Sequence, residues 1–320
     1  MDLGIGLIAV VVVIGVPAIT VLYALGTEWV LGLLPERRRP GLRPWLWLLP
    51  GVVFLGVFLV YPTITTLVLS LQDKRSEAWV GLDNYLDLFG QALFWQTIGN
   101  TVLWIIFFTG LAVFFGLLVA VLADRVRYET GIKALIFIPM AISFVAASVI
   151  WGFMYEFDPR IGTVNAGIAL LGVEEQSWVT EWPRNTIMLI IVGIWMWVGF
   201  AMVILSAGLK GINSELLEAA RMDGANEFQV FFRIILPLLS PTLAVVGTTI
   251  VIIALKTFDI VYVMTGGNYG TDVIGTLFYQ ERFVNRDAGA AAAVAVILLL
   301  TIIPVMLINI RRFQAQEAAR

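Results

Sequence analysis

Two charged side chains inside an apolar run are the first candidates for chemistry in this chain. Lys256 and Asp259 lie three residues apart within Thr242–Met264. On insertion scales a charged residue at the centre of a membrane helix costs about 2.5–3.5 kcal/mol, so such residues usually have a function or a partner. If one helix carries both residues, they share a face, where they can line a path and hydrogen-bond a polar solute. They can equally neutralise each other as an ion pair, and the sequence leaves both interpretations open.

The residue types exclude several kinds of catalysis. The chain contains no Cys and no His, which rules out disulfides, thiolate chemistry, histidine-ligated metal and histidine acid–base catalysis. It has no G-x-x-x-x-G-K-[ST] motif with which to bind ATP. A membrane enzyme would then need a carboxylate pair or a buried Ser–Lys pair, and no evident pair exists. We therefore predict that the chain is not an enzyme, with no catalytic residue, no metal site and no cofactor of its own.

The composition predicts a membrane protein built from helices. Of its 320 residues, 60% are hydrophobic and 13% are charged, whereas about 25% are charged in an average soluble domain. A helix needs about 20 apolar residues to cross a bilayer. Seven runs are long enough, which predicts an all-α polytopic fold with seven spans: Leu3–Leu34, Trp45–Leu71, Asn100–Ala123, Ala134–Tyr155, Asn185–Gly208, Thr242–Met264 and Ala288–Ile310.

The distribution of Lys and Arg predicts the orientation of these spans. The segments that lie inside if the N-terminus is outside hold about twice as many Lys and Arg as the other loops. Cytoplasmic loops carry such an excess. We therefore predict that the N-terminus is outside, the C-terminus is inside, and the polar insertion Asn213–Pro241 is cytoplasmic.

The first half of this insertion predicts a short helix and a glycine turn. Ser214 can cap the helix, and Glu215–Met222 contains good helix formers. Gly224 follows, where a helix commonly ends in the left-handed conformation that Gly adopts without steric cost.

The second half predicts an amphipathic helix that begins at Asn226. Gln229, three residues on, completes a capping-box pattern. One helical stripe is predicted from the spacing i, i+3, i+4, i+7 of Phe228, Phe231, Phe232 and Ile235. Pro237 and Pro241 then mark the return to apolar sequence.

This insertion resembles the EAA loop in the permease subunits of bacterial ABC importers. The family pattern is EAA, three residues, G, nine residues and I-x-L-P. This chain meets it in full with Glu218, Ala219, Ala220, Gly224, Ile234, Leu236 and Pro237. In the family the loop is a coupling helix that docks into a groove on a cytoplasmic ATPase. The resemblance implies that these residues, with Asp223, form the coupling surface; an ordinary glycine-capped hairpin would not require the second half of the pattern.

Other stretches extend the resemblance over about Trp45–Arg312. They are similar to the first permease subunit of carbohydrate importers, the maltose MalF type: Gly81–Gly90, Phe94–Thr101, Phe157–Ile168, Lys256–Val273 and Gly289–Ala293. The family often has a Pro shortly after the TGG of this loop. Here Asn268, Tyr269 and Gly270 follow instead, which looks closer to the alpha-glucoside permeases.

The resemblance also implies an organisation into parts. In the family the core has six spans, which correspond to residues 45–312 here. Residues 1–44 would then be an extra helix with a basic cytoplasmic loop, and residues 313–320 a cytoplasmic tail.

The resemblance implies a function and a set of partners. The chain would be the permease subunit of an ATP-driven sugar importer in the bacterial cytoplasmic (inner) membrane, with a disaccharide or alpha-glucoside as the expected solute. Its partners would be a second homologous permease, two copies of an ATPase that binds ATP and Mg, an extracytoplasmic sugar-binding protein and membrane lipid, but no nucleic acid. The alternative is a secondary transporter driven by an ion gradient, which would show inverted repeats; the chain has no convincing internal repeat.

In this context six residues are candidates for the substrate path: Lys256, Asp259, Trp195, Trp197, Tyr262 and Asn100. Trp rings can stack on a sugar through their apolar faces. Because residues at i and i+2 do not share a helix face, at most one of Trp195 and Trp197 points into the path. Packing against lipid or other helices is the alternative for each.

Overall fold

The protein is helical throughout the part that the structure describes, residues 3–124 and 126–318 of a computed structural model. Six of its helices are long and apolar enough to cross a membrane, or seven if one sharply bent pair is counted as a single span. The predicted all-α polytopic fold is therefore confirmed. The chain divides into two compact units, residues 1–66 and 67–320.

The first unit contains a helical hairpin in which an ion pair joins the two helices. Helix α1 (Leu3–Gly32) is followed by α2 (Arg39–Leu55), a π-helical turn η1 (Gly56–Val60) and the start of α3 (Tyr61–Leu69). Glu28, in the apolar α1, binds Arg43 at 2.7 Å and accepts a hydrogen bond from Trp47 Nε1 at 3.3 Å. The second span starts at Arg39 rather than at Trp45, so the basic segment predicted as a loop is partly helical.

The second unit is built around closely packed helices. Helices α5 (Ala92–Leu103), η2 (Trp104–Phe108) and α6 (Thr109–Ala123) form one span, which packs against α10 (Arg184–Lys210) and α13 (Leu236–Leu255). Small residues allow the closest approach, because a Cβ on Gly116 would lie 2.5 Å from Ala201 Cβ and 2.9 Å from Met202 N. Helix α16 (Ala288–Ala318) packs against α13 and α15 (Ile274–Tyr279).

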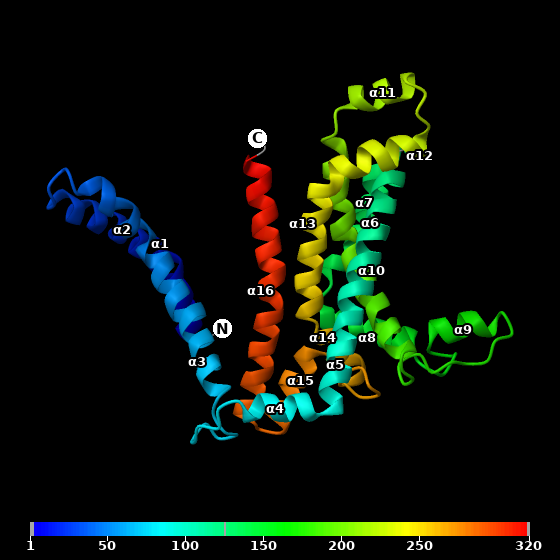
Figure 1. Cartoon of the computed structure of the whole chain (residues 1–320), viewed down its shortest axis with the longest axis horizontal. Coiled ribbons are helices and arrows are strands. Elements are labelled where there is room, and N and C mark those ends of the chain that lie inside the picture. The colour runs from blue at the N-terminus through cyan, green and yellow to red at the C-terminus, as the bar shows by residue number, and fades with distance from the viewer. Residues whose placement is uncertain (1–2, 125, 319–320) are drawn as a thin grey trace. The chain divides into compact units, whose positions relative to one another are not determined.

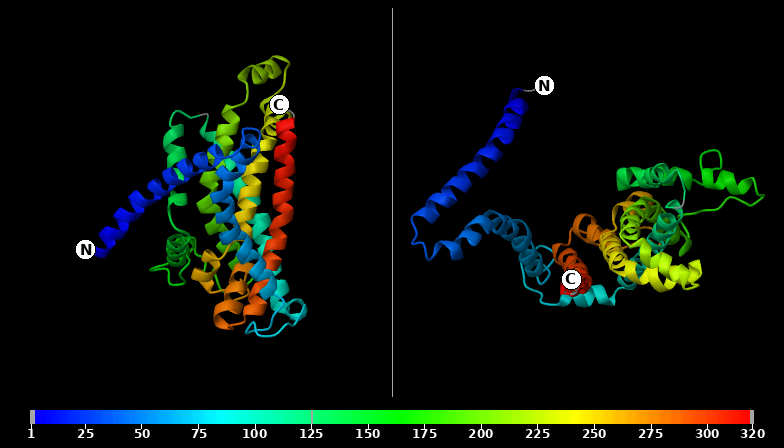
Figure 2. Two further views of the ribbon diagram at one scale, coloured as in Figure 1. Left: turned by 90° about the vertical axis from the view of Figure 1, so that its left-hand side faces the viewer. Right: turned by 90° about the horizontal axis from the view of Figure 1, so that it is seen from above.

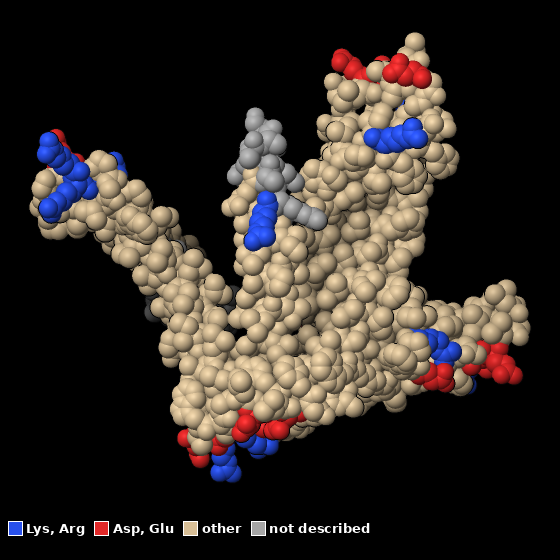
Figure 3. Space-filling view, viewed as in Figure 1, with Lys and Arg blue, Asp and Glu red and all other residues tan. Residues whose placement is uncertain are grey.

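The short helices of this unit lie at its two ends. Figure 1 shows α4 (Asp83–Gly90), α9 (Thr163–Ala169) and α15 at one end, and α11 (Ser214–Met222) and α12 (Glu227–Val230) at the other. In Figures 1 and 2 the C-terminal end of α16 lies at the same end as α11, as the predicted topology requires. On the face in Figure 3, the charged side chains of this unit gather at its two ends, with an uncharged band between them.

The fourth predicted span, Ala134–Tyr155, corresponds to a sharply bent pair of helices. The segment forms α7 (Glu129–Phe137), a 3₁₀ turn η3 (Ile138–Ala141) and α8 (Phe144–Met154), and the two helical parts are bent by 101°. Pro139 lies in the turn, where its missing N–H and its ring disfavour a continuous helix. Ser143 then starts a new helix, because its Oγ accepts a hydrogen bond from Ala146 N at 3.1 Å.

The sixth predicted span, Thr242–Met264, begins earlier in the structure than the sequence predicts. Helix α12, a π-helical turn η4 (Phe231–Ile235) and α13 form one span, Glu227–Leu255, which continues through both prolines. The π turn widens the helix before Pro237, since Leu236 N–H donates to Phe231 O five residues back, and this makes room for the proline ring. The same arrangement precedes Pro62, where Tyr61 N–H donates to Gly56 O.

The predicted span Thr242–Met264 is interrupted near its end. Helix α13 stops at Leu255, and a separate helix α14 (Asp259–Thr265) begins after the break at 256–258. Lys256 and Asp259 therefore do not share a helix face, and that expectation is wrong.

The contact between α6 and α10 gives a direct test of this packing. Gly116→Val should lower the stability of the purified protein by about 1–3 kcal/mol, because the added side chain collides with the backbone of α10. Thermal denaturation in detergent measures this effect. Gly110→Val on the same helix is the control, because a Cβ there has no atom within 4 Å; equal midpoints for the two variants would contradict the packing.

Candidate coupling surface and solute cavity

The EAA-like segment folds as a capped helix followed by a glycine turn. Asn213 Oδ1 accepts a hydrogen bond from Glu215 N at 2.9 Å, so Asn213, and not Ser214, is the cap of α11. At the other end Gly224 has a φ of +87°, and Ala225 N donates to Ala220 O at 3.0 Å. The predicted helix and left-handed glycine turn are confirmed.

The second helix starts with the predicted capping box. Asn226 N donates to Gln229 Oε1 at 2.8 Å, and Gln229 N donates to Asn226 Oδ1 at 2.9 Å. Arg221 of α11 binds Glu227 of α12 at 2.7 Å. This carboxylate raises the pKa of the Arg221 guanidinium above its ordinary value. The Arg221–Glu227 ion pair and the capping box of α12 thus stabilise the glycine turn between the two helices.

The tip of the loop exposes large apolar side chains together with the motif. Glu218, Ala219, Asp223 and Gly224 are exposed, and Ala220 is half-buried. Around them Leu216, Met222 and Phe228 are 52%, 88% and 78% exposed. Large exposed apolar side chains gathered on one short loop are a feature of sites that bind another protein.

The second half of the motif lies away from this tip. Ile234 is in the π turn, and Leu236 and Pro237 are in the first turn of α13; Ile234 and Leu236 are half-buried, and Pro237 is exposed.

The predicted helical stripe of Phe228, Phe231, Phe232 and Ile235 is interrupted by a π-helical turn. Phe228 and Phe232 are exposed, and Val230 is the fully buried side chain of this segment. The π turn that begins at Phe231 adds a residue to the turn, so the α-helical spacing no longer applies beyond that point.

A cluster of charges holds the ends of three helices beside the EAA-like segment. Lys133 Nζ binds Asp124 at 2.5 Å and Glu129 at 2.6 Å, and Lys210 Nζ binds Glu129 at 2.5 Å. Ser206 Oγ donates to Asp124 at 3.2 Å. The cluster ties α6 and α7 to the end of α10, which leads directly into Asn213.

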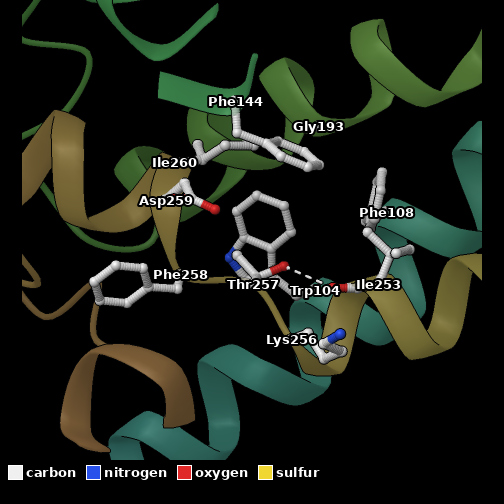
Figure 4. A pocket seen from close by; sticks show the side chains of 10 residues that line it. All are labelled: Trp104, Phe108, Phe144, Gly193, Ile253, Lys256, Thr257, Phe258, Asp259 and Ile260. Atoms are coloured by element: carbon white, nitrogen blue, oxygen red, sulfur yellow. Dashed lines mark hydrogen bonds between the residues drawn. The ribbon is translucent and has the colours of Figure 1, made fainter. Parts of the chain in front are cut away.

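The break between α13 and α14 opens onto a cavity of about 200 Å³. Lys256 and Asp259, at the two sides of the break, both line it (Figure 4). Within the described residues no ion pair joins them. The remaining lining residues are Trp104, Phe108, Phe144, Gly193, Ile253, Thr257, Phe258 and Ile260.

Sequence reasoning missed most of the cavity wall. Trp104 is 1% exposed, and its Nε1 is buried without a hydrogen-bond partner. Gly193 allows it to fit, because a Cβ there would lie 2.9 Å from the Trp104 ring and 3.3 Å from Phe108. An indole in an apolar helix is a weak sequence signal, since most such rings are simply core.

The other path candidates lie elsewhere. The ring of Trp195 packs edge-on against that of Trp151, with 5.8 Å between the ring centres, and the ring of Trp197 packs against that of Phe200, with 5.3 Å between the centres. Both Trp side chains are half-buried against the core, and neither lines the cavity. Tyr262 is 39% exposed and donates to Tyr279 Oη at 3.0 Å.

Asn100 is buried and fixes a loop instead of facing the cavity. Its Nδ2 donates to Gly270 O at 2.6 Å and to Asp272 O at 2.9 Å. From α10, Asn185 Nδ2 donates to Tyr269 O at 2.8 Å. Burial raises the pKa of the Asp272 carboxyl, although its Oδ1 accepts hydrogen bonds from Thr276 and Gln280. Two amides thus set the shape of the glycine-rich loop after α14.

Comparison with known proteins places the chain in a family. The sequence model of the family described as "Binding-protein-dependent transport system inner membrane component" matches residues 112–311. The chain is 49% identical over 279 residues to the osmoprotective compounds uptake permease protein GgtC of Synechocystis sp., covering 86% of this chain and 100% of the relative. It is 44% identical over 275 residues to the alpha-glucoside transport system permease protein AglF of Rhizobium meliloti, covering 84% and 82%.

A solved structure shares the architecture. One chain of a bacterial ABC transporter for import of the acidic polysaccharide alginate superposes with a TM-score of 0.72 at 26% identity, covering 86% of this chain and 99% of that one.

The chain belongs to the family of binding-protein-dependent transport system inner membrane components. It is a multi-pass inner membrane permease subunit of an ABC importer, which confirms the resemblance seen in the EAA-like segment. The family gives no support to a secondary transporter driven by an ion gradient.

The charge cluster beside the coupling segment predicts a stability effect. Glu129→Gln leaves Lys133 and Lys210 with weaker partners, so the purified protein should lose thermal stability at low salt. Thermal denaturation at low and high salt measures the loss, which should shrink as salt screens the charges. Glu175→Gln, at an exposed position on the opposite end, should change nothing; an equal loss in both variants would contradict the role of the cluster.

Proposed function

We propose that this chain forms one half of the translocation path of an ATP-driven importer of neutral sugars, with an alpha-glucoside or a similar small glycoside as the solute. The observation that carries the proposal is the cavity at the α13–α14 break, where one cation, one carboxylate and several aromatic rings meet inside the membrane unit. The relative named for alpha-glucoside transport supports the same class of solute.

The cavity has the hydrogen-bonding groups that a sugar requires. The Lys256 ammonium and the Trp104 Nε1–H can donate, the Asp259 carboxylate can accept, and the Thr257 hydroxyl can do both. Aromatic rings offer apolar faces to the C–H side of a sugar ring. The cation and the carboxylate balance each other, which favours a neutral solute over a strongly anionic one.

The size of the cavity supports a shared site. At about 200 Å³ it is smaller than the roughly 300–1,000 Å³ of typical ligand pockets. In our proposal a second, homologous permease supplies the opposite wall. Residues 45–312 form the importer core, and residues 1–44 form an additional helical segment.

The energy for transport comes from partner subunits in this proposal. The exposed tip of α11, with Glu218, Asp223 and Gly224 among large apolar side chains, docks into one of two ATPase copies, which bind ATP and Mg. A sugar-binding protein delivers the solute at the other face. The chain itself catalyses no reaction, and closure of the ATPases drives a rigid-body rotation of the permeases between two states.

The coupling role predicts a loss of transport without a loss of folding. Glu218→Lys or Gly224→Asp should abolish sugar uptake by proteoliposomes that contain the whole transporter, because each variant places a new side chain or charge at the ATPase contact. Co-purification of the ATPase should fall as well. Glu175→Lys, an exposed charge reversal at the opposite end, is the control. Normal uptake in either coupling variant would refute the assignment.

The path role predicts a change in the handling of solute. Asp259→Ala should raise the apparent KM for uptake by about tenfold, because a hydrogen bond to a charged group contributes about 1.5–3 kcal/mol. Uptake of radiolabelled maltose over a range of concentrations measures it. Asp87→Ala on the exposed side of α4 should leave KM unchanged. Poor expression with an unaltered KM would assign Asp259 a structural role instead.

A further inference from the structure

A second and larger hollow lies at the end of the unit opposite the coupling helix. It has a volume of about 400 Å³, within the range of typical ligand pockets. Its walls are α8, the residues 155–157 that follow it, residues 177–180 of the next loop, and the end of α14. We call it the outer groove.

The outer groove combines aromatic, hydroxyl and carboxylate groups. Glu156 is exposed, and its Oε1 accepts a hydrogen bond from Phe157 N at 3.1 Å, while Oε2 has no partner among the described residues. The hydroxyls of Ser177 and Thr180 bind each other and keep lone pairs for a further donor. Trp178 adds an aromatic ring. Apolar ring faces beside acceptors are suited to a neutral polyhydroxylated solute.

A buried amide makes the groove rigid. Asn165 has no exposed surface, and its Nδ2 donates to the carbonyls of Glu156, Phe157 and Gln176 at 3.1, 3.1 and 3.0 Å. Its Oδ1 accepts from Gln176 N and from Trp178 Nε1, both at 3.0 Å. The Asn165 side chain therefore joins the two loop segments that form the groove wall. Because these segments are already held in place, a ligand that binds there loses little affinity to the ordering of loops.

An arginine fixes the same wall from α10. Arg184 donates to Gln176 Oε1 at 2.8 Å and to Ser177 O at 2.7 Å, and its guanidinium lies 5.8 Å from the centre of the Trp178 ring. Arg184 forms an ion pair with Glu181 at 2.7 Å. Glu156 therefore remains the carboxylate available to a ligand.

The outer groove and the inner cavity lie along the same two helices. On α8, Phe144 lines the cavity and Ser148, one turn further on, lines the groove. On α14, Asp259 lines the cavity and Val263 lines the groove. Four residues of helix correspond to about 6 Å, and α8 packs against α14. A solute in the groove is therefore about one helical turn from the cavity.

We propose that the outer groove is a sugar-binding subsite that receives a neutral glycoside at the outer face before it moves to the cavity at Lys256 and Asp259. This inference rests on the proposed function and adds a site to it. Glu156 accepts hydrogen bonds from sugar hydroxyls there, and the adjoining rings cover the apolar face of the sugar.

A steric plug tests the proposal. Gly152 lies in α8 and lines the groove, and a Cβ there meets no atom within 4 Å, so the side chain of Gly152→Phe can start into the groove without displacing the backbone. ATP-driven maltose uptake by proteoliposomes with the complete transporter and its binding protein should fall at least tenfold. Binding-protein-stimulated ATP hydrolysis and complex assembly should persist. Gly167→Phe in α9, where a Cβ is equally free, is the matched control.

A second pair of variants tests the carboxylate. Glu156→Gln should weaken maltose binding to the transporter without its binding protein by about tenfold, as measured by saturation-transfer NMR titration. Asp158→Asn, two residues away, should not, since Asp158 is already bound to Arg160 at 2.5 Å and is not part of the groove wall.

The outcomes separate the two proposals. If the native transporter moves no maltose or other alpha-glucoside, the proposed function fails. If native transport is normal and both Gly152→Phe and Glu156→Gln behave like their controls, the subsite fails. Loss of binding-protein association in Gly152→Phe, with maltose binding intact, would make the groove a protein-docking site and would also overturn the proposal.

Discussion

The structure of the membrane-spanning helices depends on the need to satisfy each backbone hydrogen bond where water is absent. Helices meet this need internally, and irregular backbone is tolerated in a membrane only where protein or a cavity surrounds it. This chain places prolines within its spans, and widened turns accommodate two of them. The turns before Pro62 and Pro237 are π-helical, so the chain makes room for each ring and the helix continues.

The irregular segments of the second unit converge on one place. Trp104 and Phe108 come from the π turn η2, Phe144 is the first residue after the bend at α7–α8, and Lys256 and Asp259 flank the α13–α14 break. Each irregularity moves backbone or side chains out of regular helix packing, and together they leave the inner cavity between them. A cavity that can hold a polar solute inside a helical membrane protein thus arises where three spans are imperfect, and the intact α10 closes it with Gly193.

The sequence was informative where local chemistry decides the structure. The Asn226–Gln229 capping box and the turn at Gly224 follow from neighbouring residues, and the structure agrees with them. The predicted span Asn185–Gly208 lies within α10, whose ends differ from it by one and two residues. Hydropathy could not reveal the break at 256–258, because Thr257 and Phe258 are compatible with a continuous span. Tertiary packing determines it: a Cβ on Gly275 would lie 2.6 Å from Thr257 O, so α15 closely approaches the interrupted backbone. The same limit explains why Lys256 and Asp259 were found as a pair but their companions Trp104 and Gly193 were not.

Helix α10 links the features on which function depends. Near its start Asn185 holds the glycine-rich loop, in its middle Gly193 forms part of the cavity wall, and at its end Lys210 joins the charge cluster before the EAA-like segment. It is unbroken over Arg184–Lys210 and is packed along α6, so it behaves as one rigid element. A displacement of its coupling end cannot be absorbed within the helix and must appear as a shift of α10 against α6, α8 and α14. Because α8 and α14 line both hollows, such a shift changes the cavity and the outer groove together, and this geometry suits a transporter that must open one side while it closes the other.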